Sequence, residues 1–196
     1  MKKLILATGN PGKVREMKQI LNGLYDEIVS MKEAGVAVEV VEDADSFLGN
    51  AAKKALAISR LVDCDVVSDD SGLCVRGLGG RPGVYSARYS AEGTDAANNA
   101  KLVREVSRLP EEERDAHYEC AIVLARKGTI AFSCECRCEG HIMLEPRGTE
   151  GFGYDPYFLL PEYGKTFGEM EPERKNQISH RAKALAELRR FAESEQ

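Results

Sequence analysis

The sequence lacks the features of several large classes of protein. No apolar run approaches the roughly 20 residues of a membrane-spanning helix, and no repeat, low-complexity tract or obvious linker is visible. Basic residues are not in excess, because 27 Lys and Arg against 32 Asp and Glu give a net charge of −5. The broad positive charge of a nucleic-acid-binding protein is therefore missing. We expect neither a membrane nor a nucleic acid as a partner, and an anionic ligand needs a local cationic pocket.

The six cysteines lack the C-x2-C spacing of a zinc knuckle. Three of them, Cys134, Cys136 and Cys138, follow one another at every second position, so their side chains would share one face of a strand. Because a free cysteine behaves as a small buried hydrophobe, we interpret this row as reduced core residues. A metal or redox role for the row is the alternative.

Length and composition predict a single domain over residues 1–196, with one core or two intimately packed lobes. The basic start leads into only a short apolar stretch, which predicts the buried first strand of a cytoplasmic protein. Apolar spacing, caps and turns predict strands at residues 2–7, 36–41, 65–68, 116–125 and 129–138, and helices beginning after residue 12 and near residues 46, 95 and 179. The last two strands flank Lys127-Gly128 as a hairpin. This alternation predicts an α/β fold with a mixed sheet.

Residues 8–13 (TGNPGK) form a glycine-rich turn between the first strand and the first helix. Glycines let the backbone approach a ligand closely, the helix start offers unpaired N–H groups, and Lys13 adds a positive charge. The segment does not fit the Walker A pattern. It is a candidate phosphate cradle, with an ordinary strand-to-helix turn as the alternative.

Asp69 and Asp70 are adjacent carboxylates at the end of an apolar strand, where we expect a loop over residues 69–72. Burying both charges is costly without a cation. A hard, oxygen-seeking ion such as Mg²⁺ is their natural partner. A simple Asp-Asp-Ser-Gly turn is the alternative.

Two later segments carry candidate recognition groups. Residues 151–156 (GFGYDP) place two aromatic rings between glycines, where they can stack on a base or close a tight turn in the core. Residues 179–181 (SHR) place His180 and Arg181 in the first turn of the last helix, where cations oppose the helix dipole unless an anion is near. This conflict favours a functional role for the pair.

Five segments in the same order together resemble the inosine/xanthosine triphosphate pyrophosphatases, a house-cleaning family found from bacteria to humans. The matching segments, spread over almost the whole chain, are residues 8–13, 68–73, 78–88, 151–156 and 178–181. The resemblance implies a two-lobed α/β protein with a mixed central sheet flanked by helices. It also implies a homodimer and a triphosphate-binding cleft between the lobes.

The resemblance also implies roles for individual residues. Asp70 becomes the catalytic acid–base carboxylate and, with Glu42, a ligand of Mg²⁺; Glu39 is the alternative to Glu42. Implied substrate-binding residues are Thr8, Gly9, Asn10, Pro11, Gly12, Lys13, Lys54, Ser71, Phe152, Gly153, Tyr154, Asp155, Lys175, His180 and Arg181. One departure is Gly49, where the family has glutamate; losing this half of a capping box predicts weaker local stability without loss of catalysis.

The implied reaction is hydrolysis of ITP, dITP or XTP to the monophosphate and pyrophosphate. Lys13 and Lys54 would hold phosphate oxygens while water attacks the α-phosphorus. By the resemblance, Phe152 would stack on the base, and the purine edge would be surrounded by Tyr154, Asp155, Lys175, His180 and Arg181. Donors aimed at the 6-oxo group would be unpaired against adenine, which disfavours ATP. A nucleotide sensor without turnover and a cysteine-based metal or redox protein are the alternatives. The preferred substrate, the choice between Mg²⁺ and Mn²⁺ and the dimer geometry stay open.

Overall fold

Two compact units make up the chain. The computed structural model describes residues 2–195. Unit 1 comprises Met1–Asp70, Cys120–Cys136 and Arg181–Gln196, and unit 2 comprises Ser71–Glu119 and Arg137–His180. Each unit is therefore built from segments that are distant in the sequence.

One seven-stranded mixed sheet runs through the described residues, in the order β2-β1-β3-β4-β5-β6-β7. The strands are β1 (Lys3–Leu6), β2 (Glu27–Ser30), β3 (Asp65–Val75), β4 (Asp115–Arg126), β5 (Thr129–Ile142), β6 (Phe158–Leu160) and β7 (Lys165–Thr166). Strand β1 pairs in parallel with both β2 and β3, whereas β6 pairs antiparallel with β5 and β7. The predicted α/β fold with a mixed sheet is confirmed.

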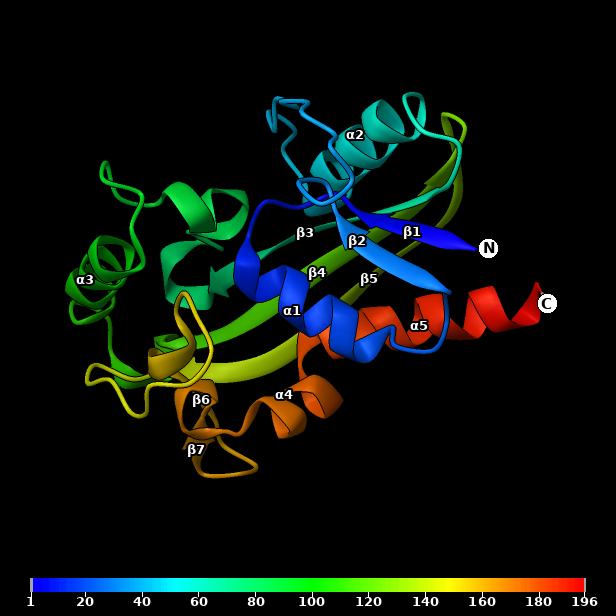
Figure 1. Ribbon diagram of the computed structural model, residues 1–196. Coiled ribbons are helices and arrows are strands. Elements are labelled where there is room, and N and C mark those ends of the chain that lie inside the picture. Colours follow the sequence, from blue (N-terminus) through cyan, green and yellow to red (C-terminus); the bar gives the residue numbers. More distant parts are fainter. Residues whose placement is uncertain (1, 196) are drawn as a thin grey trace. The chain divides into compact units, whose positions relative to one another are not determined.

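Unit 1 packs helices on both faces of its strands. Leu4 and Leu6 of β1 contribute to a core shared with α1 (Pro11–Ile20) and α5 (His180–Ser194), while Ile5 and Ala7 join a second core with α2 (Phe47–Ser59). This split follows from the alternation of side chains along a strand. Figure 1 shows α1 (blue) beside α5 (red), with α2 (cyan) across the strands from them.

Unit 2 has an aromatic core beneath α3 (Asp95–Val106). The rings of Tyr118 and Phe158 lie 4.5 Å apart between centroids, and Phe158 stacks on Phe167 at 5.4 Å. The remaining elements of this unit are α4 (Pro172–Ile178) and the short 3-10 helices η1 (Arg76–Leu78), η2 (Gly83–Arg88), η3 (Glu111–Glu113), η4 (Asp155–Tyr157) and η5 (Phe167–Glu169). The glycine-rich residues 77–93 overlap η1 and contain η2.

Local signals placed several elements correctly. Ser46 caps α2 by accepting a hydrogen bond from Gly49 N at 3.1 Å, as its position predicts. Strands β4 and β5 are neighbours joined at Lys127 and Gly128, whose φ values of 47° and 77° suit a type I′ hairpin turn. The expected helix starts near residues 95 and 179 are confirmed by α3 and α5.

Two expectations about strands were wrong. Residues 36–41 form no strand, and the outer strand is instead β2. Alternating apolar residues form a strand only where their backbone pairs with a neighbouring strand, and the place beside β1 is taken by β2. Residues 69–72 are not a loop, since β3 continues to Val75. The acidic pair therefore lies inside a strand, where Asp69 and Asp70 point to opposite faces.

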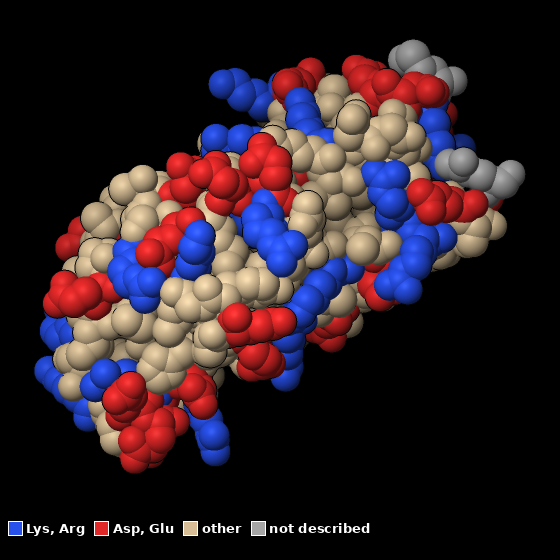
Figure 2. Space-filling view, turned by 90° about the horizontal axis from the view of Figure 1, so that it is seen from below, with Lys and Arg blue, Asp and Glu red and all other residues tan. Residues whose placement is uncertain are grey.

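In the part of the chain that the structure describes, the surface charges and the helix hydrophobicity match two expectations from the composition, namely no broad positive charge and no membrane-spanning helix. On the face drawn in Figure 2, acidic and basic side chains are intermingled over the described residues. Within residues 2–195, no helix is long and apolar enough to cross a membrane.

Candidate active site

The glycine-rich turn positions Lys13 at the start of α1. Asn10 Oδ1 accepts hydrogen bonds from Gly12 N at 2.9 Å and Lys13 N at 3.2 Å, and Asn10 O accepts one from Val14 N at 3.0 Å. Pro11 has no N–H group, so these described residues leave no unpaired N–H in the first turn. The expectation of unpaired helix N–H groups for phosphate is wrong, because the Asn10 cap already satisfies them. The positive charge available to an anion at this turn is therefore that of the Lys13 side chain.

Asp69 is a fully buried carboxylate held by cations. Its Oδ2 accepts from Arg181 Nε at 3.0 Å and from the Cys120 thiol at 3.0 Å, and its Oδ1 forms an ion pair with Lys13. Burial alone would raise its pKa, but the charges of Arg181 and Lys13 outweigh burial and hold the pKa well below the usual range. Asp69 is thus a permanent anion that anchors Lys13.

Asp70 has a different environment from its neighbour. It is 8% exposed, and its Oδ2 has no hydrogen-bond partner. Burial raises the pKa of Asp70, while the charges of Lys13 and Lys54 oppose that rise. A buried carboxylate oxygen without a partner is costly, so this oxygen fits a cation or a water molecule as its missing partner.

Lys54 of α2 connects Glu42 to the acidic strand. Its Nζ lies 3.2 Å from Glu42 Oε2 and donates to Asp69 O at 2.9 Å. Glu42, Glu39 and Lys54 all line a cavity of about 1130 Å³ in unit 1, together with Thr8, Gly9 and Pro11. Asp70 and Glu42 both interact with Lys54, and carboxylate oxygens are hard donors of the kind that Mg²⁺ prefers. The preference for Glu42 over Glu39 stays a prediction.

Arg181 is enclosed within unit 1. It is 1% exposed, and its guanidinium contacts Asp69 through Nε and Glu16 through Nη1. Burial lowers the pKa of an arginine, but the two carboxylates reverse this and raise it. The predicted role of Arg181 at the base edge stays a prediction, and its contacts identify a second function as the counter-ion of Asp69 and Glu16.

Unit 2 brings together the predicted base-recognition residues of its own segments. Lys175 Nζ lies 2.7 Å from Asp155 Oδ2 and 4.6 Å from the centre of the Phe152 ring. Asp155 Oδ2 also accepts from Phe152 N at 3.0 Å. His180 stacks on Tyr118, with ring centroids 4.6 Å apart. Tyr118 in turn donates to Asp155 Oδ1 at 3.2 Å, which connects all five residues.

Some of these contacts were not expected from the sequence. The sequence around Tyr118 predicts only a hairpin strand, and nothing in it indicates the hydrogen bond to Asp155. Asp95 accepts from Gly153 N at 2.8 Å, and Asn99 donates to Gly153 O at 2.9 Å. Asp95 and Asn99 both belong to α3. The sequence of this helix does not indicate a contact with a residue 54 or more positions away.

The predicted site residues therefore divide between the two units. Unit 1 holds Thr8, Gly9, Asn10, Pro11, Gly12, Lys13, Glu42, Lys54, Asp70 and Arg181, and unit 2 holds Ser71, Phe152, Gly153, Tyr154, Asp155, Lys175 and His180. The groups suited to phosphate and metal thus belong to unit 1. The aromatic and polar groups suited to a base belong mainly to unit 2.

The row of cysteines also has its predicted character. Cys134, Cys136 and Cys138 are free thiols on β5, where they alternate with exposed residues and pack against the cores. Burial raises the pKa of Cys134 to about 12, so its thiol is protonated at neutral pH. These positions are consistent with reduced packing residues.

Comparison with known proteins adds independent evidence. The sequence model of the Ham1 family matches residues 4–191. A dITP/XTP pyrophosphatase of Geobacillus kaustophilus is 49% identical over 189 residues, which are 96% of this chain and 93% of that protein. A dITP/XTP pyrophosphatase of Bacillus subtilis is 44% identical over 99% of this chain and 98% of its own length.

Solved structures agree with the sequence relatives. A HAM1 protein from Coxiella burnetii aligns with a TM-score of 0.88 and 33% identity, covering 99% of this chain and 100% of its own. The Staphylococcus aureus Ham1 protein aligns with a TM-score of 0.87 and 34% identity over the full length of both chains. With both sequence and fold matched over nearly its whole length, this chain belongs to the Ham1 family.

Proposed function

We propose that this protein hydrolyses the non-standard purine nucleoside triphosphates ITP, dITP and XTP to the nucleoside monophosphate and pyrophosphate. The observation that carries the proposal is Asp70, a buried carboxylate with one unpartnered oxygen next to two lysines. This chemistry lies in a chain whose relatives, at 49% and 44% identity, bear the name dITP/XTP pyrophosphatase. The reaction removes deaminated purines from the nucleotide pool.

We also propose that Mg²⁺ takes part. Asp70 and Glu42 would hold the ion, since Asp70 Oδ2 lacks a partner and both groups are hard oxygen donors. When bound, the ion would neutralise charge on the phosphate oxygens and on the leaving pyrophosphate. Lys13 and Lys54 supply further positive charge for the same oxygens.

Asp70 is suited to handle the proton of the attacking water. Its burial raises its pKa, which strengthens it as a base, while Lys13 and Lys54 favour the ionised form that can accept a proton. Water attacks the α-phosphorus, the bond to the pyrophosphate oxygen breaks, and the proton of the water passes to Asp70. Asp69 keeps Lys13 in place through its ion pair.

Base selection rests on the connected group in unit 2. Phe152 offers a ring for stacking, and Lys175 is a donor beside it. A donor matched to a 6-oxo group is left unpaired when adenine is bound, and a buried unpaired donor is strongly penalised. We therefore expect Lys175→Met to reduce kcat/KM for ITP more than for ATP, with the matched surface change Lys127→Met affecting neither. An equal loss for both nucleotides would assign Lys175 to structure or phosphate binding.

The decisive experiment measures pyrophosphate release from a panel of nucleoside triphosphates, with Mg²⁺ and with excess chelator. We expect activity on ITP, dITP and XTP that stops on chelation and returns with Mg²⁺. Asp70→Asn should abolish turnover in a folded protein, because it keeps the shape and removes the charge, whereas the exposed Asp63→Asn should be neutral. Binding without turnover in the unaltered protein would instead identify a nucleotide sensor. Activity in excess chelator would contradict the metal role.

The proposal includes assembly and location. The family resemblance leads us to propose a homodimer in the cytoplasm. Light scattering on the purified protein tests the dimer, and a single-chain mass would contradict it.

A further inference from the structure

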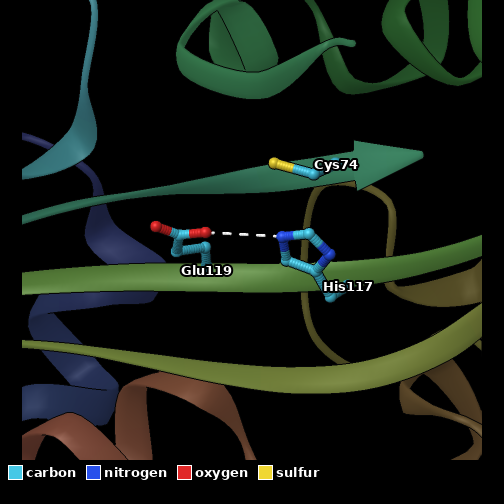
Figure 3. A group of neighbouring side chains, drawn as sticks. All are labelled: Cys74, His117 and Glu119. Carbon is cyan, nitrogen blue, oxygen red and sulfur yellow. Dashed lines mark ion pairs between the residues drawn. The ribbon is translucent and has the colours of Figure 1, made fainter. Parts of the chain in front are cut away.

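A group of three metal-ligating side chains lies outside the site described above. Cys74 on β3 and His117 and Glu119 on β4 each direct one ligand atom to a common point, with all of these atoms within 4.8 Å of one another. Figure 3 shows the three side chains pointing toward one another from the two strands. All three residues belong to unit 2, and none has a role in the proposed hydrolysis.

The strands themselves create this convergence. His117 and Glu119 are two positions apart on β4, so they share a face, and β3 is the neighbouring strand in the sheet. Tyr118, between them, and Leu73 and Val75, which flank Cys74, all point into the core of unit 2. The three ligating groups therefore stand on the opposite face of the sheet, where each is only partly buried and accessible to an ion.

The separation of the imidazole and carboxylate atoms suits a small tetrahedral ion. His117 Nε2 lies 3.3 Å from Glu119 Oε2. A tetrahedral zinc ion with Zn–N and Zn–O bonds of about 2.0–2.1 Å holds such a pair roughly 3.3 Å apart. The ligand types also indicate the metal, because a thiolate, an imidazole and a carboxylate together suit zinc, whereas Mg²⁺ and Ca²⁺ take oxygen ligands.

We propose that Cys74, His117 and Glu119 form a zinc-binding site, with water in the fourth position. Binding replaces the proton of the Cys74 thiol by the Zn–S bond and releases that proton to solvent. The imidazole binds as a neutral ligand through Nε2, and Glu119 binds as a carboxylate. The site carries two negative charges from its ligands, which balance the charge of the ion.

Two surrounding features set the strength of the site. Burial, and next the charge of Glu119, raise the pKa of Cys74 to about 11, so the ion has to displace a firmly held proton. Arg137 Nε donates to Glu119 Oε2 at 2.8 Å. This is the same oxygen that faces His117. A carboxylate oxygen has two lone pairs, so Oε2 can accept from Arg137 with one and ligate the metal with the other. Zinc would then cross-link β3 to β4 and stabilise unit 2.

The test is zinc binding by the full-length protein in excess Mg²⁺, which occupies sites for hard cations. We expect one zinc ion per chain by titration calorimetry and elemental analysis, and a higher Tm with zinc. Cys74→Ser should weaken binding by more than the roughly 10–100-fold that loss of an outer-shell partner costs, and His117→Gln and Glu119→Gln should weaken it as well. The matched changes Cys136→Ser and His141→Gln should leave it intact.

Two further measurements distinguish a loss of metal binding from misfolding of a variant. Cobalt(II) should give the visible bands of a tetrahedral ion and a sulfur-to-metal charge-transfer band that Cys74→Ser removes. In the unaltered protein, zinc should protect the Cys74 peptide from alkylation without protecting the Cys136 peptide. The proposal is overturned by the absence of saturable zinc binding, by full binding in Cys74→Ser, or by an equal loss in Cys136→Ser. It does not depend on the hydrolase activity, which the pyrophosphate assay measures separately.

Discussion

Replacing Arg181 by methionine tests the buried charge network of unit 1. The guanidinium is 1% exposed and contacts two carboxylates, Asp69 at 3.0 Å and Glu16. Methionine fills much of the same volume but removes the charge. Asp69 then keeps Lys13 as a counter-ion and loses the larger of its two favourable charge interactions. Glu16 loses the same cation.

The expected cost follows from this burial. Removing one partner of a buried ion pair leaves an uncompensated buried charge and costs about 3–5 kcal/mol. For a chain of this length each kcal/mol lowers Tm by roughly 2–4 °C, so Arg181→Met should lower Tm by roughly 6–20 °C. The matched control is Arg190→Met on the same helix, whose ion pair with Glu187 is 69% exposed on the arginine side. Exposed pairs contribute about 0–1 kcal/mol.

The stability loss should depend on pH in a defined direction. The folded-state pKa of Asp69 is lowered, so its stabilising contribution is fully present above the unfolded pKa of about 3.9 and is lost progressively as pH falls from there toward the folded-state pKa. The difference in unfolding free energy between Arg181→Met and the unaltered protein should therefore be large near pH 7 and shrink in acid. Urea unfolding followed by circular dichroism at several pH values measures it. Equal stability of the two proteins at pH 7, or an equal loss in Arg190→Met, would refute the reasoning.

Two further predictions concern the site. In the Mg²⁺-free protein, the Asp70 carboxyl should titrate above the ordinary aspartate range in a carbon-13 NMR titration, because burial raises its pKa. Lys54→Gln should move that titration to still higher pH, because the charge of Lys54 lowers the pKa of Asp70; an unmoved titration would exclude this interaction. Gly151→Ala should destabilise the protein by about 1–3 kcal/mol, because its φ is +76° and a Cβ would lie 2.0 Å from Asp155 Oδ2. Gly164→Ala, with φ of +62° and open space around it, separates backbone strain from that contact in thermal unfolding.

The surroundings of Gly49 restrict which side chain can replace it. The missing glutamate was expected to weaken the start of α2, and Ser46 still caps the helix through Gly49 N. A Cβ at Gly49 would lie 2.8 Å from Ala44 Cβ and 3.0 Å from Ser46 Oγ. Restoring a glutamate here thus requires the preceding turn to shift, whatever hydrogen bond it adds. The local stability itself stays a prediction.

The sequence by itself determined the features that depend on a few neighbouring residues. Ser46 and the pair Lys127-Gly128 each act within three or four positions, through a cap or a tight turn, and they mark the start of α2 and the β4–β5 connection. The motifs also sufficed to indicate the family, because a set of short segments in a fixed order needs no knowledge of contacts. Residues 36–41 show the limit, since apolar alternation does not decide whether a segment pairs with a strand of the sheet.

Only the tertiary structure decided how the charged residues are paired. Asp69 and Asp70 are adjacent and chemically identical in the sequence, yet the strand sends them to opposite faces. Asp69 pairs with Arg181, 112 positions away in the sequence, and its charge is balanced by that cation. Asp70 has an oxygen, Oδ2, without a hydrogen-bond partner. Tyr118 likewise finds Asp155, and Cys74 finds His117, only because strands distant in the chain are neighbours in the sheet. Such pairings depend on sheet order and strand register, which no local pattern encodes.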